Sequence, residues 1–233
     1  GLPNVYTAYQ PVTDADTRTR FEKAWMAPLP AVPGLTATEM VDGILTGSVK
    51  AWYVMGENPI MSEPNQHHAR HALEGLEFFV AQDIFFNETN VYADVILPAT
   101  SFAEKEGTFT NSDRRVQRVR PAVPPPGIAR DDWDVIADLA RRMIDRLATS
   151  RESEDDSADP LAAACRQHRD EMIASWRYGA AEDVWNEMRK VTPDFEGISY
   201  ERLERESGVH WPCPTSDHPG TPFLFEESFP RGR

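Results

Sequence analysis

The chain has 233 residues, of which 40% are hydrophobic, and a formal net charge of −14. This length allows one large domain or one domain with a smaller appendage. The acidic balance excludes nucleic acid as the main partner, because phosphate neutralisation takes a basic face. The two cysteines form neither a disulfide framework nor a CxxC pair for zinc or an iron–sulfur cluster, and no apolar run approaches the length of a membrane span. Reduced thiols are the default in the cytoplasm, which is the expected compartment.

Residues 1–34 are rich in proline and turn-forming residues, and one short helix is predicted around residues 17–25. We interpret this segment as a connector that lies on another surface. A capping box formed by Thr36 and Glu39 then predicts the start of a helix, and Gly47 predicts its end.

Three short apolar runs, at residues 49–55, 76–81 and 94–97, are strand candidates, and the composition of the first predicts burial on both faces. A polar helix at residues 65–74 and a helical turn near residues 87–92 separate them. Such alternation implies parallel pairing with right-handed crossovers. Residues 35–148 are therefore predicted to form an α/β domain, a Rossmann-like parallel sheet flanked by helices.

Residues 99–120 fit no single period and are predicted to be an ordered loop with extended pieces. An amphipathic helix follows from Asp131 or Asp132, with its apolar face formed by Trp133, Ile136, Ala137, Ala140, Met143, Ile144 and Leu147. Residues 149–160 are acidic and rich in serine, which is typical of a solvated linker or a disordered insertion. Residues 161–233 are expected to be a helical and extended tail that wraps from Trp211 onward, with Cys165 buried on a helix face.

Polar clusters follow the predicted strands between residues 52 and 132. In an open α/β sheet, residues just past the carboxyl ends of the strands line the ligand crevice. Asp83 follows such a strand, and its carboxylate can accept the N1–H and the exocyclic amino group of a guanine. Position alone favours an ordinary helix N-cap for the same residue.

Other polar residues of this stretch also have two interpretations. Lys105, beside Gly107, can reach a diphosphate as a point charge, although an isolated lysine between acids is more often part of a weak surface ion pair. Helix capping accounts for Asp132. Asn58 before Pro59 fits either contact with a ligand amide or hydroxyl or an ordinary turn.

Four segments are specific when taken together, in this order and spacing: VMGENP (54–59), QDIF (82–85), ADVILP (93–98) and EKEGTFTNSDRRVQ (104–117). They resemble the catalytic subunit of molybdenum- or tungsten-dependent formate dehydrogenases, within the molybdopterin oxidoreductase superfamily. Three pieces of the tail resemble the formate dehydrogenase branch, namely VWNEM (184–188), GISY (197–200) and WPCP (211–214). The resemblance covers nearly the whole chain, except for the acidic stretch after Thr149 and the helix around Cys165.

This resemblance implies a bis(molybdopterin guanine dinucleotide) cofactor with molybdenum or tungsten, and an α/β segment that holds one guanine dinucleotide arm. Residues that match cofactor-contacting positions of the family are Asn58, Gln82, Asp83, Lys105 and Asp132. On this basis Asp83 and Lys105 are interpreted as cofactor ligands. The family's iron–sulfur cysteine set and its cysteine or selenocysteine metal ligand do not occur in this sequence, so no catalytic residue and no metal ligand is expected here.

The chain begins without an initiator Met and ends about where the family's C-terminal barrel would begin. We therefore expect a middle segment of the catalytic subunit, from a split gene or a truncated chain. It is expected to be inactive alone and to take part in oxidising formate to carbon dioxide once the remaining segments and the electron-transfer subunits complete it. Two alternatives stay open: a non-catalytic relative similar to the large iron–sulfur subunit of respiratory complex I, and another reductase such as nitrate reductase.

Overall fold

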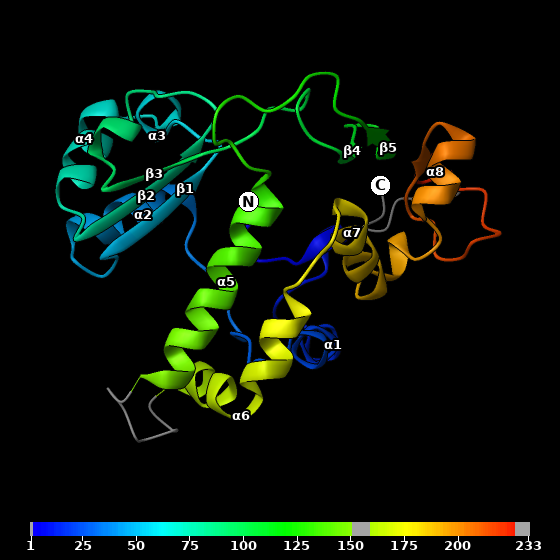
Figure 1. The fold of residues 1–233 in the computed structure, drawn as a ribbon, viewed down its shortest axis with the longest axis horizontal. Helices are drawn as coiled ribbons and strands as arrows, with labels where there is room; N and C mark the ends of the chain where they lie inside the picture. The colour runs from blue at the N-terminus through cyan, green and yellow to red at the C-terminus, as the bar shows by residue number, and fades with distance from the viewer. Residues whose placement is uncertain (1, 151–158, 227–233) are drawn as a thin grey trace.

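The computed structural model describes residues 2–150 and 159–226 (Figure 1). It begins with the 3-10 turn η1 (Thr7–Tyr9) and helix α1 (Ala15–Trp25). The helix starts where the carboxylate of Asp14 accepts a hydrogen bond of 2.7 Å from the backbone N–H of Thr17. The short helix predicted in this part is confirmed. Its Trp25 donates an indole hydrogen bond of 3.2 Å to Glu187, so the N-terminal part lies against a helix of the tail.

The α/β part follows the predicted order of elements. It consists of α2 (Ala37–Leu45), β1 (Ala51–Met55), α3 (Pro59–Ser62), α4 (Gln66–Glu74), β2 (Phe78–Asp83), the 3-10 turn η2 (Asn90–Tyr92) and β3 (Val95–Pro98). The predicted capping box is present, because the side chain of Thr36 accepts from Glu39 N–H while the Glu39 carboxylate accepts from Thr36 N–H. Gly47 follows the helix with a φ of 76°, which a glycine adopts without a steric penalty.

The three strands form a parallel sheet in the order β1-β2-β3, in which Val54 lies opposite Ala81 and Ala81 opposite Ile96. Helices α2 and α4 pack on one side of it (Figure 1). Phe79 and Leu73 are nearly fully buried in the core between the sheet and these helices. The predicted α/β fold with a parallel sheet is confirmed.

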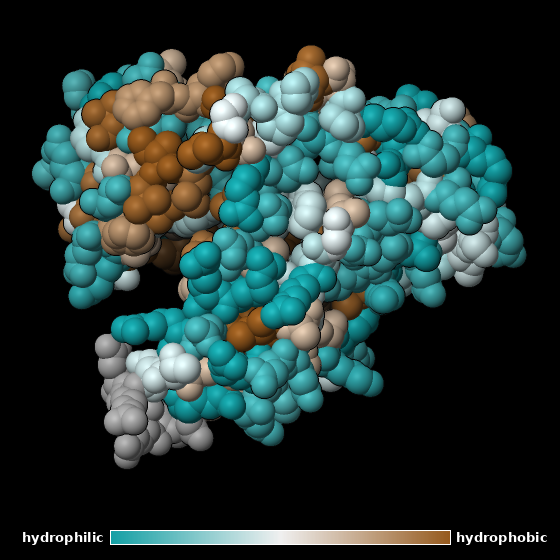
Figure 2. Space-filling model, viewed as in Figure 1, coloured by the Kyte–Doolittle hydropathy of each residue, from teal (hydrophilic) through white to brown (hydrophobic). Residues whose placement is uncertain are grey.

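The prediction that the first strand is buried on both faces is wrong. Met55 of β1 is 43% exposed, Phe78 of β2 is 47% exposed and Val95 of β3 is 38% exposed. Helices of the described residues cover one side of the sheet, and hydrophobic side chains gather at the surface in this region (Figure 2). Composition reports that a strand is apolar, but not whether both of its sides are covered.

The extended pieces predicted within residues 99–120 are present, and they pair as a β-hairpin, which was not predicted. Strands β4 (Gly107–Thr110) and β5 (Arg115–Val119) pair antiparallel, and β6 (Val209–His210) of the tail adds to β5. The tail therefore joins the hairpin as a third strand through residues that precede the stretch from Trp211 onward, for which wrapping was predicted.

Helices α5 (Asp132–Thr149) and α6 (Pro160–Ser175) pack against each other through Ile144, Cys165 and Met172. The burial predicted for Cys165 is confirmed. Met143 was placed on the apolar face of α5 but is 53% exposed, because the apolar stripe is wider than the surface that covers it. The prediction for the acidic stretch concerns mainly residues 151–158, which lie outside the described residues.

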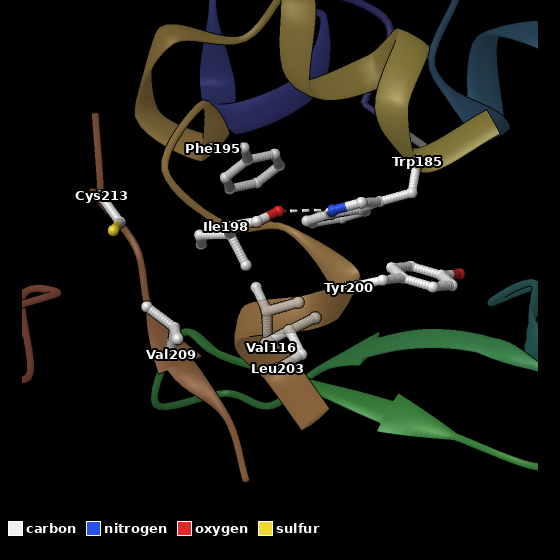
Figure 3. Packing of buried hydrophobic residues seen from close by; sticks show 8 residues of the cluster. All are labelled: Val116, Trp185, Phe195, Ile198, Tyr200, Leu203, Val209 and Cys213. Atoms are coloured by element: carbon white, nitrogen blue, oxygen red, sulfur yellow. Dashed lines mark hydrogen bonds between the residues drawn. The ribbon is translucent and has the colours of Figure 1, made fainter. Parts of the chain in front are cut away.

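The tail continues with α7 (Ala181–Lys190), the 3-10 turn η3 (Pro193–Phe195) and α8 (Tyr200–Glu206). A second hydrophobic core joins these elements to the hairpin (Figure 3), and it consists of Val116, Trp185, Phe195, Ile198, Tyr200, Leu203, Val209 and Cys213. The indole N–H of Trp185 donates to the carbonyl of Ile198 at 2.7 Å. Arg202 is 6% exposed and donates to the carbonyls of Gly197 and His218, at 3.2 and 2.7 Å. Among the described residues, no helix is both long and apolar enough to cross a membrane.

Gly197 is required by close backbone packing in this tail. A Cβ there would lie 2.7 Å from the carbonyl oxygen of Cys213 and still closer to that of Thr215. We predict that Gly197→Ala lowers the free energy of unfolding by about 3 kcal/mol, because backbone atoms cannot move aside as a flexible side chain can. Urea denaturation followed by circular dichroism measures the loss. Gly34→Ala is the control, since its Cβ would make ordinary contacts of 3.7 Å; an equal loss in both variants would contradict the prediction.

Candidate functional site

A cleft of about 360 Å³ opens at the carboxyl ends of β1 and β2. It is lined by Met55, Gly56, Gln82, Asp83, Ile84, Ala99, Thr100, Ser101, Phe102, Lys105, Phe109 and Asp132. This is the edge of a parallel sheet at which α/β proteins bind ligands. Four of the five predicted site residues therefore meet in one cleft, and Asn58 lies outside its lining.

A chain of hydrogen bonds crosses one wall of this cleft. The hydroxyl of Tyr53 donates to Gln82 Oε1, and Gln82 Nε2 donates to Asp132 Oδ1 at 2.7 Å. Lys105 Nζ lies 2.6 Å from Asp132 Oδ2. Burial and the charge of Asp132 raise the pKa of Tyr53, so its hydroxyl remains a donor at neutral pH.

The structure corrects two interpretations of these residues. Asp131, not Asp132, is the N-cap of α5, and Asp132 is the first helical residue, whose two carboxylate oxygens bind Gln82 and Lys105. The Lys105–Asp132 ion pair is not a loose surface pair, because the side chains are only 22% and 30% exposed. Asp132 is therefore not the N-cap of α5, and Lys105 is not part of an exposed surface ion pair.

Asp83 organises the loop that follows β2. Its Oδ1 accepts from the N–H groups of Ile84 and Phe85, at 2.7 and 3.4 Å, and its Oδ2 accepts from Asn87 Nδ2 at 2.8 Å. This pattern is an Asx turn rather than a helix N-cap. Oδ2 keeps a second lone pair, whereas Oδ1 already accepts two hydrogen bonds, and the residue lines the cleft.

Asn58 belongs to a neighbouring network. Its Nδ2 donates to Glu88 at 2.8 Å, and its Oδ1 accepts from the hydroxyl of Thr89 at 2.7 Å. The hydrogen bond from Asn58 lowers the pKa of Glu88. These bonds connect the start of α3 with the loop before η2, which favours the structural interpretation, and a contact between Asn58 and a ligand stays a prediction.

Other lining residues were not predicted. Thr100 is 2% exposed and donates to Asp131 at 2.8 Å, which fixes the start of α5 beside the cleft. Phe102 is 67% exposed and Phe109 is 46% exposed, so two aromatic rings border the opening. The position of Thr100 two residues after the third strand was the available signal, whereas nothing in the sequence indicated the two rings.

The lining offers one positive charge, on Lys105, together with the carboxylates of Asp83 and Asp132. An ammonium group has three N–H donors, so Lys105 can hold Asp132 and still donate to an anion. The arrangement suits recognition of a polar ligand that carries both a negative charge and hydrogen-bond donors.

Comparison with known proteins defines the class. Residues 13–142, more than half of the chain, match the family described as molybdopterin oxidoreductase. The chain belongs to the molybdopterin oxidoreductase family. The resemblance inferred from the motifs is thereby confirmed at the level of the family.

The relatives include enzymes with different substrates. An F420-dependent formate dehydrogenase subunit alpha of Methanocaldococcus jannaschii is 42% identical over 98% of this chain and 29% of its own length. The assimilatory nitrate reductase catalytic subunit of Bacillus subtilis is 40% identical over 95% of this chain and 28% of its own length. Formate dehydrogenase H of Escherichia coli is 36% identical over 98% and 28%. The chain spans less than a third of each of these relatives.

Among solved structures, the acetylene hydratase from Pelobacter acetylenicus matches with a TM-score of 0.52 and 20% identity. The match covers 75% of this chain and 20% of that one. At this identity the match supports the fold alone.

The partly buried ion pair gives a stability prediction. We predict that Lys105→Met lowers the free energy of unfolding by about 1–2 kcal/mol, because one oxygen of Asp132 loses a charged partner in a half-buried position. Lys50→Met is the matched control, since the Lys50–Glu77 pair is 68% and 66% exposed and should contribute little. Urea denaturation of both variants is the measurement, and losses of equal size would contradict the prediction.

Proposed function

We propose that this chain is the cofactor-binding segment of a molybdenum- or tungsten-dependent formate dehydrogenase catalytic subunit. The observation that carries the proposal is the meeting of Gln82, Asp83, Lys105 and Asp132 in one cleft. The complete subunit would oxidise formate to carbon dioxide. The division into a connector (1–34), an α/β domain (35–148), an acidic linker (149–160) and a tail (161–233) stays a prediction.

The cleft has the chemistry that a guanine dinucleotide arm needs. Lys105 has ammonium protons beyond the one that faces Asp132 and can bind a diphosphate oxygen. Asp83 Oδ2 has one free lone pair, and the long 3.4 Å bond from Phe85 to Oδ1 could give way to a ligand donor, so the carboxylate can meet the two N–H groups on the guanine edge. Gly56, with a φ of 64° and no atom within 4 Å of an added Cβ, leaves open space where the backbone passes the cleft.

The bound metal and its pterins supply the two-electron chemistry of the reaction. The residues of this chain would bind and orient the cofactor: Lys105 through charge, Asp83 through its carboxylate, and Gln82 with Asp132 by fixing the lysine. An iron–sulfur cluster and the metal ligand would come from other segments, and electron-transfer subunits would accept the electrons. Two buried free thiols fit a cytoplasmic location.

Nitrate reduction is the second candidate, favoured by the relative from Bacillus subtilis. The GENP motif and the tail motifs support formate. Dye assays on the purified full-length subunit, one with formate and one with nitrate, discriminate between the two candidate functions. Metal and pterin are measured in the same sample. Formate-dependent dye reduction in proportion to metal content is the expected result. A protein without metal or pterin would instead support a structural relative similar to the complex I subunit.

We predict that Asp83→Ala in the full-length subunit lowers the cofactor content more than it lowers the turnover of the loaded fraction. Loss of a hydrogen bond to a charged group costs about 1.5–3 kcal/mol, enough to reduce occupancy about tenfold or more. Metal and pterin per protein, with turnover per metal, are the measurements.

The control is Asp94→Ala at the opposite end of the sheet. Asp94 accepts a hydrogen bond of 2.7 Å from Phe79 N–H and lies outside the cleft lining, so this variant should lose stability but load normally. Asp83→Asn, which keeps the size of the side chain and one acceptor oxygen, should give an intermediate loss. Normal loading of Asp83→Ala would remove Asp83 from the site.

A further inference from the structure

We propose that Tyr53 is a positioning residue of this cleft, which acts by holding the Gln82 amide in the one orientation that supports Asp132 and Lys105. Tyr53 is outside the lining of the cleft, so it would act through Gln82 and not by touching the cofactor. The role of Tyr53 in cofactor binding rests on the proposed function. The chain of hydrogen bonds from Tyr53 through Gln82 and Asp132 to Lys105 is independent of that function.

The sheet places Tyr53 beside Gln82. In the parallel register Tyr53 of β1 lies opposite Val80 of β2, and Gln82 lies two residues after Val80 on β2. Side chains two residues apart on a strand share a face, so the ring of Tyr53 and the amide of Gln82 lie on the same side of the sheet. The phenolic hydroxyl then reaches Gln82 Oε1.

The chemistry of the partners fixes the direction of each bond. An ionised carboxylate only accepts hydrogen bonds, so Gln82 must present Nε2 to Asp132, as it does at 2.7 Å. Its Oε1 then faces Tyr53, and a carbonyl oxygen needs a donor there. The hydroxyl of Tyr53 is that donor. The carboxylate of Asp132 decides which end of the amide faces it, and the hydroxyl of Tyr53 holds the amide in that position by satisfying Oε1.

Removal of the hydroxyl has a specific consequence. Gln82 is 1% exposed, so water cannot easily replace the lost donor. Oε1 is then a buried acceptor without a donor, so the amide is no longer held in the position from which Nε2 donates to Asp132. Asp132 loses a neutral donor, and the position of the Lys105 ammonium group on the other oxygen is no longer fixed.

A mutant cycle in the full-length subunit tests this role. The variants are Tyr53→Phe, Asp132→Asn and the double variant, with Tyr92→Phe as the matched control, because Tyr92 packs against the same sheet core but is not part of the hydrogen-bond chain. An asparagine at 132 can donate or accept, so it satisfies either orientation of Gln82. The readouts are molybdenum plus tungsten per subunit and the unfolding temperature of the cofactor-free protein.

The expected result is a loss of cofactor occupancy of about fivefold in Tyr53→Phe, the ratio for one buried hydrogen bond. In the Asp132→Asn background the same change should lower occupancy less than twofold and barely shift the unfolding temperature. Tyr92→Phe should leave both readouts unchanged. Equal effects of Tyr53→Phe in both backgrounds, or no effect on either readout in the parent, would overturn the proposal.

Gln82→Met provides a second route should Tyr53→Phe fold poorly. It removes both hydrogen bonds of the amide, so adding Tyr53→Phe to it should have no further effect; an additional loss would overturn the proposal. The unfolding temperatures separate this inference from the proposed function. A coupling between Tyr53 and Asp132 in the cofactor-free protein, with normal cofactor loading in Asp83→Ala and Tyr53→Phe, would support the positioning bond but contradict the cofactor site.

Discussion

The carboxylate of Asp132 joins parts of the chain that are distant in sequence, and the cleft depends on that junction. Its two oxygens bind Gln82, 50 residues away, and Lys105, 27 residues away. A strand end, a loop and the first turn of α5 are thereby held together. A half-buried carboxylate is stable only when donors satisfy it, and charge-assisted hydrogen bonds are stronger than neutral ones. The pairing therefore stabilises the wall of the cleft while it places a positive charge at its edge.

The tail contributes to this arrangement through the hairpin. The guanidinium of Arg118 lies 3.6 Å from the ring centroid of Tyr200, and it also pairs with Glu106, next to Lys105 in sequence. Val116 of the same hairpin is fully buried against α7 and α8 (Figure 3). The helices of the tail thus support, through the hairpin, the loop that carries Lys105, so the cleft and the helical tail are parts of one packed arrangement.

Local signals were enough to predict the α/β half. The capping box at Thr36 and Glu39 is visible in sequence because all of its atoms come from one turn, and the alternation of strands and helices implied the parallel sheet. The second sheet was not predictable, because β4 and β5 are short and β6 comes from residues 209–210. The partners of Asp132 were also missed, because they are distant in sequence. A residue at a helix start suggests capping, and only the tertiary structure brings Gln82 and Lys105 to the Asp132 carboxylate. The motifs located the cleft, whereas the hydroxyl of Tyr53 had no sequence signal at all.

Among the described residues, one side of the parallel sheet is largely exposed away from the cleft, and the side chains there have two opposite physical effects. Met55, Phe78 and Val95 are each more than a third exposed, although parallel strands are ordinarily covered on both sides. In water such a surface favours self-association, because an unpaired strand edge beside apolar side chains invites a second sheet. Under a covering layer, each square ångström would contribute about 25 cal/mol to stability. The same few residues would therefore set both the solubility of this chain and its affinity for any surface that covered them, and a substitution that improves one would weaken the other.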